Sequence, residues 1–149
     1  MAADHSEGYE AIAAQFIAAR SDIDATFVRC WARENLQPSS SIVDVGCGSG
    51  VPIARALIEY GFTLFGVDAS PSLLAAFRRR FPAAQSVCEA AEDSLFFNRT
   101  FDAALAIGLL FLLSADNQRK VVKRVAAALR PGGLFCSPRL GSGANGTTC

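Results

Sequence analysis

The stretch SIVDVGCGSG, residues 41–50, decides the fold of this chain. A largely apolar run over 41–45 is typical of a strand that is buried on both faces. Three glycines follow at alternate positions, Gly46, Gly48 and Gly50. Glycine inside a regular element costs roughly 0.5–1 kcal/mol relative to alanine, so three together indicate that something approaches the backbone closely. The loop leaves the carboxyl end of a strand and opens a helix, which is where open α/β sheets bind ligands.

Outside this stretch, apolar strands alternate with amphipathic helices. We predict helices over 9–36, with a break near Ser21 or Asp22, and over 51–60, 71–80 and 114–130, the last with Val121, Val122, Val125 and Leu129 facing inward. We predict strands over 41–45, 62–68, 84–90 and 101–108, and a fifth that begins at 134 after the breaker PGG. Such alternation indicates βαβ units, and therefore an α/β fold with a mostly parallel sheet and helices on both faces.

Composition excludes several classes of function. The 149 residues carry 14 basic and 14 acidic side chains, so a net charge of zero gives no electrostatic case for nucleic acid or a membrane surface. The longest apolar run, residues 103–113, is shorter than the roughly 20 residues that a membrane span needs. The five cysteines are odd in number and show no metal-ligand spacing, so we expect reduced thiols, no metal site and a cytoplasmic protein.

A second polar signal lies at the end of the next predicted strand, in GVDAS, residues 66–70. A carboxylate such as Asp68 at that strand end can accept both hydroxyl groups of a ribose, as in dinucleotide sites. Its alternative role is to cap the next helix, which Ser70 fills better. The glycine spacing is G-x-G-x-G rather than the dinucleotide pattern, and Asp44 would repel a pyrophosphate but attract an ammonium group. These residues favour an adenosine-containing ligand that bears a positively charged group.

At this point the sequence resembles the class I S-adenosylmethionine-dependent methyltransferases, over roughly residues 9–138. The stretches VDVGCGSG, GVDAS, FDAALAIGLLFLL and LRPGG are similar to four motifs of that family, in the same order. The resemblance implies a Rossmann-like sheet and S-adenosylmethionine as cofactor, with S-adenosylhomocysteine as product. It implies these cofactor-binding residues: Tyr9, Arg20, Asp44, Gly46, Cys47, Gly48, Gly50, Asp68, Ala69, Ala91, Glu92 and Ile107.

The resemblance also implies a role for each part of this set. Asp44 and the glycine loop would hold the amino-acid end of the cofactor, and Asp68 the ribose. Glu92, with the Ala91 backbone, would meet the adenine, although Glu89 and Asp93 are alternatives and a solvated loop is another. Tyr9 and Arg20 resemble elements of a helical lid, the arginine reaching the cofactor carboxylate, unless it is an ordinary surface arginine.

The resemblance divides the chain into an N-terminal helical lid over 1–36, an S-adenosylmethionine-binding core over 37–138 and an irregular tail over 139–149. It implies methyl transfer to a small-molecule acceptor, with no membrane or nucleic-acid partner. Because the donor is already activated, positioning can supply most of the rate, and we expect no catalytic side chain. Two alternatives stay open: a non-catalytic or partner-completed S-adenosylmethionine-binding module, and a nicotinamide oxidoreductase, against which the loop spacing and Asp44 argue.

The end of the chain departs from the family pattern. Members continue beyond LRPGG with further strands and a helix, whereas this sequence ends in GLFCSPRLGSGANGTTC, so about two strands are expected to be missing. An uncovered sheet edge invites pairing. We therefore expect either a truncated product, a fragment completed by a partner or by self-association through that edge, or a compact cofactor-binding relative.

Overall fold

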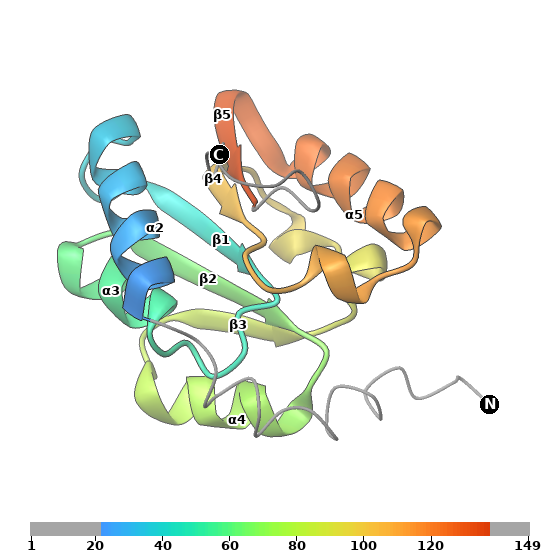
Figure 1. Cartoon of the computed structure of the whole chain (residues 1–149), viewed down its shortest axis with the longest axis horizontal. Coiled ribbons are helices and arrows are strands. Elements are labelled where there is room, and N and C mark those ends of the chain that lie inside the picture. Colours follow the sequence, from blue (N-terminus) through green and yellow to red (C-terminus); the bar gives the residue numbers. More distant parts are fainter. Residues whose placement is uncertain (1–21, 138–149) are drawn as a thin grey trace.

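The computed structural model describes residues 22–137, so the predicted helix at 9–20, with Tyr9 and Arg20, lies outside the described residues. The centre of the molecule is a five-stranded sheet in the order β3-β2-β1-β4-β5, and every neighbouring pair is parallel. The strands are β1 (Ser41–Val45), β2 (Thr63–Asp68), β3 (Gln85–Cys88), β4 (Phe101–Leu105) and β5 (Leu129–Cys136). This arrangement confirms the predicted α/β fold class, because every crossover between parallel strands carries helical structure (Figure 1).

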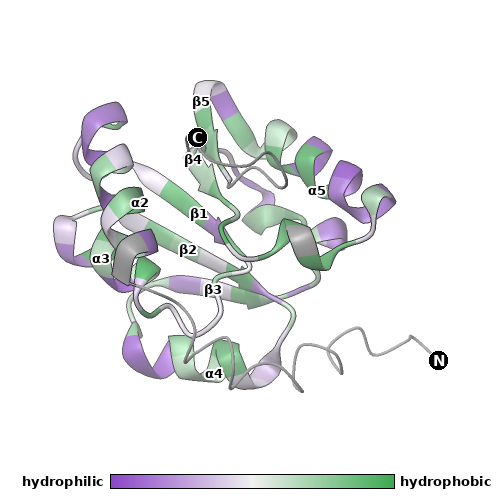
Figure 2. Ribbon diagram, in the orientation of Figure 1, coloured by the Kyte–Doolittle hydropathy of each residue, from purple (hydrophilic) through white to green (hydrophobic). Residues whose placement is uncertain are grey.

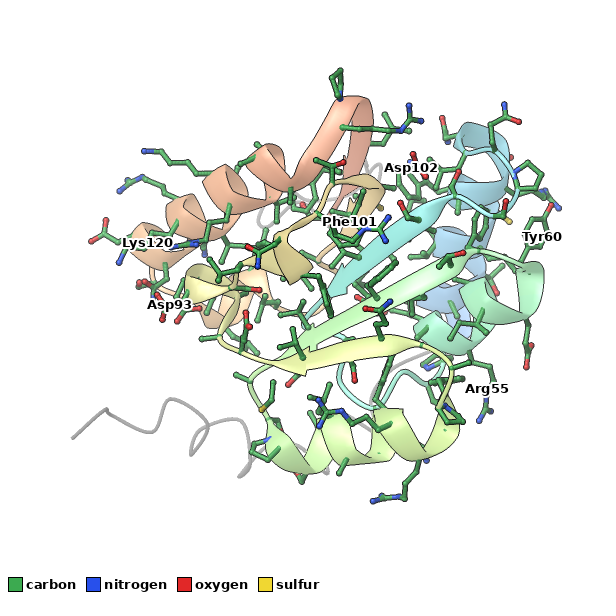
Figure 3. The ribbon with its side chains drawn as sticks, turned by 180° about the vertical axis from the view of Figure 1, so that it is seen from behind. Arg55, Tyr60, Asp93, Phe101, Asp102 and Lys120 are labelled. Atoms are coloured by element: carbon green, nitrogen blue, oxygen red, sulfur yellow. The ribbon has the colours of Figure 1, made fainter. Side chains whose placement is uncertain are left out.

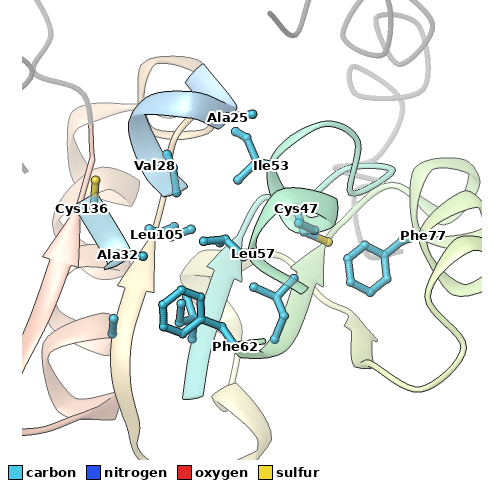
Figure 4. Packing of buried hydrophobic residues seen from close by; sticks show 14 of the residues in the cluster. Ala25, Val28, Ala32, Cys47, Ile53, Leu57, Phe62, Phe77, Leu105 and Cys136 are labelled. Atoms are coloured by element: carbon cyan, nitrogen blue, oxygen red, sulfur yellow. The ribbon is translucent and has the colours of Figure 1, made fainter. Parts of the chain in front are cut away.

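Helices cover both faces of the sheet. They are α2 (Asp22–Asn35), α3 (Ile53–Tyr60), α4 (Pro71–Arg80) and α5 (Ala115–Ala128), with single 3₁₀ turns η1 (Ala91–Asp93), η2 (Phe96–Asn98) and η3 (Leu110–Leu112). One buried cluster joins α2, α3 and α4 to the sheet, and Figure 4 shows its side chains. A second cluster joins α5, η1 and η2 to the opposite face. The molecule is therefore a three-layer α/β/α sandwich.

The central strand β1 shows why these layers form. Ile42 packs into the cluster on the α2 side, whereas Val43 and Val45 pack on the α5 side, because successive side chains of a strand point to opposite faces. All three are almost completely buried, and burying such a side chain contributes about 1.5–3 kcal/mol. The outer residues of α5 are hydrophilic, as Figure 2 shows. Because β1 is packed on both faces, its position is well defined, and so is the point at which the glycine loop leaves the sheet.

Several predicted boundaries are confirmed. Strand β1 has the predicted bounds, and α4 begins at Pro71 with Ser70 as its cap, the Ser70 hydroxyl accepting a hydrogen bond of 3.2 Å from the Leu73 N–H. Gly61 ends α3 in a left-handed conformation, with φ of 113°. Caps and glycines act locally, so their positions can be predicted from sequence alone.

Other predictions about the C-terminal half are wrong. The PGG breaker does not separate α5 from the last strand: β5 begins at Leu129 and contains these residues, with a register shift against β4. Proline is tolerated there because, within residues 22–137, β5 pairs with β4 alone and forms an edge. Val122, predicted to face inward, is 44% exposed, since Val121 and Val125 define the buried stripe of α5.

The cysteines follow the prediction in part. Cys30, Cys47 and Cys88 carry reduced thiols. The expectation of a reduced thiol is wrong for Cys136, which is disulfide-bonded. In the described part of the chain, no helix is both long enough and apolar enough to span a membrane.

Candidate functional site

The glycine loop joins β1 to α3 and is held by its own backbone. The N–H groups of Gly46 and Cys47 both donate to the carbonyl of Val67 on β2, at 2.7 and 3.1 Å, and Gly50 N–H donates to the Cys47 carbonyl at 3.1 Å. These donors are therefore used within the protein. The loop offers a ligand close approach to its backbone rather than these three N–H groups.

Two of the glycines are required by packing as well as by backbone conformation. Gly46 has φ of +77°, and a Cβ there would lie 2.9 Å from the Leu109 Cβ. Gly50 has φ of +83°, and a Cβ there would lie 2.6 Å from Phe81 and 2.8 Å from Phe77 of α4. A positive φ and a contact below 3 Å both disfavour any residue with a side chain at these two positions. The glycines therefore let the loop pass closely between α4 and the segment that follows β4.

Asp68, at the end of β2, ties the glycine loop to the next helix. Its Oδ2 accepts a hydrogen bond of 2.8 Å from Gly48 N–H, and its Oδ1 accepts one of 2.8 Å from Ser70 N–H. The residue is only 7% exposed. Charge-assisted hydrogen bonds of this kind are stronger than neutral ones, so the carboxylate orders the loop before any ligand arrives.

A cavity of about 210 Å³ opens beside this loop, at the carboxyl ends of the strands. The structure brings together in its lining five of the predicted cofactor residues: Gly46, Asp68, Ala69, Ala91 and Glu92. It adds residues that were considered only as an alternative or not predicted: Val67, Glu89, Ala90, Leu109, Leu112, Leu113, Ser114 and Asn117. Half of these additions, Leu109, Leu112, Leu113 and Ser114, come from the segment between β4 and α5. Its apolar run, which directly follows a predicted strand, was the available signal.

The other predicted residues within 22–137 lie outside this lining. Asp44 is fully buried on β1, behind the glycine loop. Cys47 is also fully buried, and a Cβ added at Gly66 would lie only 2.8 Å from its sulfur. Cys47 therefore acts as a small, closely packed core residue rather than as a reactive thiol. Ile107 packs on the cluster of α2 and α3, and Leu109, two residues later, lines the cavity instead. Gly48 and Gly50 shape the loop.

The cavity lining has one sign of charge. Asp68, Glu89 and Glu92 contribute three carboxylates, and among residues 22–137 no lysine or arginine lines it. Glu89 is anchored, since its Oε2 accepts from Leu95 N–H at 3.2 Å and its own N–H donates to the Asp68 carbonyl at 3.0 Å. Leu109, Leu112 and Leu113 supply an apolar wall. Such a site can accept hydroxyl groups, favour a cation and exclude a pyrophosphate.

The described part of the molecule contains no candidate metal site. Among residues 22–137, no group of three or more His, Cys, Asp or Glu side chains is placed to hold a metal ion.

Comparison with known proteins agrees with this geometry. Residues 42–133 match the family described as "Methyltransferase domain". The chain is 32% identical over 104 residues to an uncharacterised methyltransferase of Synechocystis, covering 68% of this chain and 49% of that protein. It is 33% identical over 111 residues to the 18S rRNA (guanine(1575)-N(7))-methyltransferase of Saccharomyces cerevisiae, covering 68% and 40%. The chain thus spans half or less of the length of these curated relatives.

Solved structures share the fold. A TehB-like SAM-dependent methyltransferase from Corynebacterium glutamicum superimposes with a TM-score of 0.72 at 25% identity, covering 89% of this chain and 71% of that one. The SAM-bound amino pentose methyltransferase CalS10 of Micromonospora echinaspora gives 0.70 at 26% identity, covering 88% and 55%. With the family match over most of the sheet, these similarities show that the chain belongs to the class I S-adenosylmethionine-dependent methyltransferase family.

Proposed function

We propose that this chain binds S-adenosylmethionine in the cavity beside the glycine loop and takes part in methyl transfer to a small-molecule acceptor. The observation that carries the proposal is the lining that residues 22–137 give to that cavity, with three carboxylates, an apolar wall and no basic side chain. S-adenosylmethionine combines a ribose, an apolar adenine face and a positive charge, so its chemistry matches this lining. The SAM complex of CalS10 supports the same ligand class.

Asp68 can serve the ligand while it holds the loop. A carboxylate has about four acceptor sites, and the bonds from Gly48 and Ser70 engage one on each oxygen. The proposal places the ribose hydroxyl groups as donors to this carboxylate, which lines the cavity. Because the loop is already ordered, binding costs less conformational entropy.

The remaining residues would position the ligand and exclude water. The carboxylates of Glu89 and Glu92 favour a positively charged ligand, and the leucines of the segment 109–113 shield it from solvent. When bound, S-adenosylmethionine supplies a methyl group activated by the sulfonium charge. A dinucleotide fits less well, because its pyrophosphate would lie among carboxylates without an arginine or lysine in the lining.

The acceptor class rests on charge and on relatives. The zero net charge of the chain gives no general attraction to a polynucleotide. A sugar N-methyltransferase and a glycine/sarcosine N-methyltransferase are among the similar proteins, although an rRNA methyltransferase is too. A small acceptor is therefore our proposal, together with a cytoplasmic location. The lid role of Tyr9 and Arg20, the three-part division of the chain and self-association through the β5 edge stay predictions.

Calorimetric titration of the chain with S-adenosylmethionine and, separately, with NAD tests the proposed ligand. We expect saturable binding of the first alone. Binding of NAD alone, or of neither, would contradict the proposal. Incubation with a panel of amine, hydroxyl and carboxylate acceptors, with S-adenosylhomocysteine as the measured product, then separates an enzyme from a binding module. The module predicts binding without product on every acceptor.

A further inference from the structure

A second cavity lies on the α5 side of the sheet, between the segment 94–100 and the C-terminal half of α5. Its volume is about 360 Å³. Two arginines, Arg99 and Arg124, contribute to its lining, and no acidic residue of the described range 22–137 does. The cavity therefore has the opposite charge to the one beside the glycine loop.

The guanidinium of Arg99 lies over two aromatic rings of the sheet. Its carbon lies 4.5 Å from the ring centroid of Phe65 on β2 and 5.1 Å from that of Phe101 on β4, which Figure 3 labels. The Nε donates to the Thr100 carbonyl at 3.2 Å. Contact with aromatic faces at these distances is attractive, so the rings and the Thr100 carbonyl help to position the guanidinium, although Arg99 as a whole is an exposed residue.

The turn before Arg99 sets this position. Phe96, Phe97 and Asn98 have φ of 45°, 59° and 52°, three consecutive non-glycine residues in the left-handed region. The turn is held by Ser94, which is 1% exposed and whose hydroxyl accepts from Phe96 N–H at 3.0 Å.

Arg124 reaches the same cavity from α5. Its Nη1 donates to the Ser94 carbonyl at 3.1 Å, and both residues line the cavity. The ion pairs between described residues involve other arginines, Arg119 with Asp116 and Arg130 with Asp102. Neither cavity arginine is therefore neutralised by a carboxylate within residues 22–137.

We propose that this cavity binds the phosphate group of a small ligand. Guanidinium groups match phosphate oxygens in charge and in the geometry of their paired N–H donors. Both arginines belong to the lining of one cavity and neither pairs with a carboxylate among residues 22–137, so a dianion bound there would meet two positive charges. The volume exceeds that of a phosphate ion, so the cavity can also hold part of the molecule that carries it. This inference does not rest on the proposed methyl transfer.

The test uses the full chain labelled with ¹⁵N. Inorganic phosphate and ribose 5-phosphate are titrated separately, and NMR shifts are followed at the backbone amides of Ser94 and Thr100 and at the Arg99 Nε–H. We expect saturable shifts at these groups. Tighter binding of ribose 5-phosphate identifies a phosphorylated metabolite as the source of the phosphate, and equal binding identifies the free ion.

Arg124→Gln should weaken this binding about 10–100-fold, the size expected for lost hydrogen bonds to a charged group. The matched control is Lys123→Gln, which removes the same charge from the neighbouring position of α5 but from a residue outside the cavity lining. Its affinity should stay near that of the wild type. Arg124→Lys should recover part of the binding, because it restores the charge without the fork.

Three results would overturn the proposal. The first is a linear, unsaturated response to both phosphates. The second is an equal loss in the Arg124→Gln and Lys123→Gln variants, which would mean diffuse surface attraction. The third is binding of a single-stranded RNA oligonucleotide without binding of either small phosphate, which would mean a nucleic-acid surface. The spectrum of each variant shows whether it is folded, and Arg99→Lys gives a second variant of the cavity that keeps its charge.

Discussion

The cavity beside the glycine loop and the cavity lined by Arg99 and Arg124 are built from adjoining parts of one stretch of chain but have opposite charge. Residues 89–92 line the cavity beside the glycine loop, together with Asp68, and contribute two of its three carboxylates. Residues 94–100 line the second cavity, where Arg99 and Arg124 supply two guanidiniums. The comparison teaches that a family fold fixes where one ligand site lies, whereas the connecting segment can build another with different chemistry.

The difference has a structural origin. The first cavity lies where parallel strands end side by side, as is usual in such sheets. Gly46 after β1 and Asp68 at the end of β2 lie at the same edge of the sheet and line it. The second depends on a left-handed turn at Phe96, Phe97 and Asn98, and on α5 lying across it. Changes in the glycine loop should therefore affect the first cavity alone.

The largest expected effect comes from Gly46→Ala. The substitution places a methyl 2.9 Å from Leu109 Cβ at a φ of +77°, so it adds overpacking to backbone strain. We expect a loss of about 2–4 kcal/mol in the free energy of unfolding. Urea denaturation followed by circular dichroism measures it.

Gly48→Ala is the matched control for this change. Its φ is +58°, but the nearest atom to the new methyl would be Leu73 Cδ1 at 3.9 Å, an ordinary contact. Only the strain remains, so we expect a loss of about 1–2 kcal/mol. Equal losses in the two variants would show that Leu109 moves aside and that the cavity wall is soft.

The second effect concerns Asp68. Asp68→Ala should weaken S-adenosylmethionine binding by about 1.5–3 kcal/mol, because hydrogen bonds to a carboxylate are lost. The same variant should bind inorganic phosphate like the wild type if the two cavities are independent. Calorimetry with both ligands measures the contrast.

Loss of the bonds to Gly48 and Ser70 in this variant must be separated from loss of ribose contacts. Adenosine and 2′,3′-dideoxyadenosine serve as competing ligands for the wild type and the variant, in a double-mutant cycle. The wild type should prefer adenosine, and Asp68→Ala should lose that preference. A preference that survives in the variant would remove the ribose role and leave Asp68 as a loop anchor.

The smallest effect lies outside both cavities, at Asp102 on β4. Its carboxylate accepts hydrogen bonds from the backbone N–H of Ser41 at 2.8 Å and from the Ser41 hydroxyl at 3.2 Å, and it pairs with Arg130. The Ser41 backbone hydrogen bond, aided by its hydroxyl and by Arg130, holds the pKa of Asp102 below its ordinary value of 3.8, although burial opposes the shift. Because the folded pKa is the lower one, this stabilisation is present above the unfolded pKa and is lost as pH falls through the folded value.

Asp102→Asn should therefore lower the stability at neutral pH by less than about 1 kcal/mol, since Arg130 is half exposed and solvent screens the pair. The gap between variant and wild type should close as the solution is acidified below the unfolded pKa. Thermal unfolding across a pH series measures it. A gap that stays constant with pH would assign the effect to packing. Ligand affinities at both cavities should be unchanged.

How far the sequence predicts the site can be judged from single residues. Gly46 and Asp68 could be predicted because Gly46 directly follows an apolar strand and Asp68 ends the next one, and strand ends converge in a parallel sheet. The cavity role of Leu109 could not, because β4 ends at Leu105 rather than at the predicted 108, which changes which later residues face the cavity. The internal use of the loop N–H groups depends on the Val67 carbonyl, which sequence spacing does not position.

The second cavity, lined by Arg99 and Arg124, could not be predicted from sequence patterns. No glycine marks the left-handed turn, and Arg99 and Arg124 are 25 positions apart on a loop and a helix. Only the packing of α5 against η1 and the sheet brings them to one cavity. Similarly, the exposure of Val122 followed from the rotation of α5, which the identity of its side chains alone does not fix.

The strand order has a consequence for the speed of folding. The central strand β1 pairs with β4 so that Ile42 lies opposite Ala103, and Ser41 bonds to Asp102 across 61 residues of sequence. The chain must close that long loop, with the β2 and β3 crossovers inside it, before the middle of the sheet exists. Closing such a loop costs conformational entropy before the stabilising contacts form. Sheets with many pairs that are distant in sequence therefore fold slowly. We therefore expect β1 and β2, which are joined by the shorter α3 crossover, to pair first, while the β4 side of β1 stays open until late in folding.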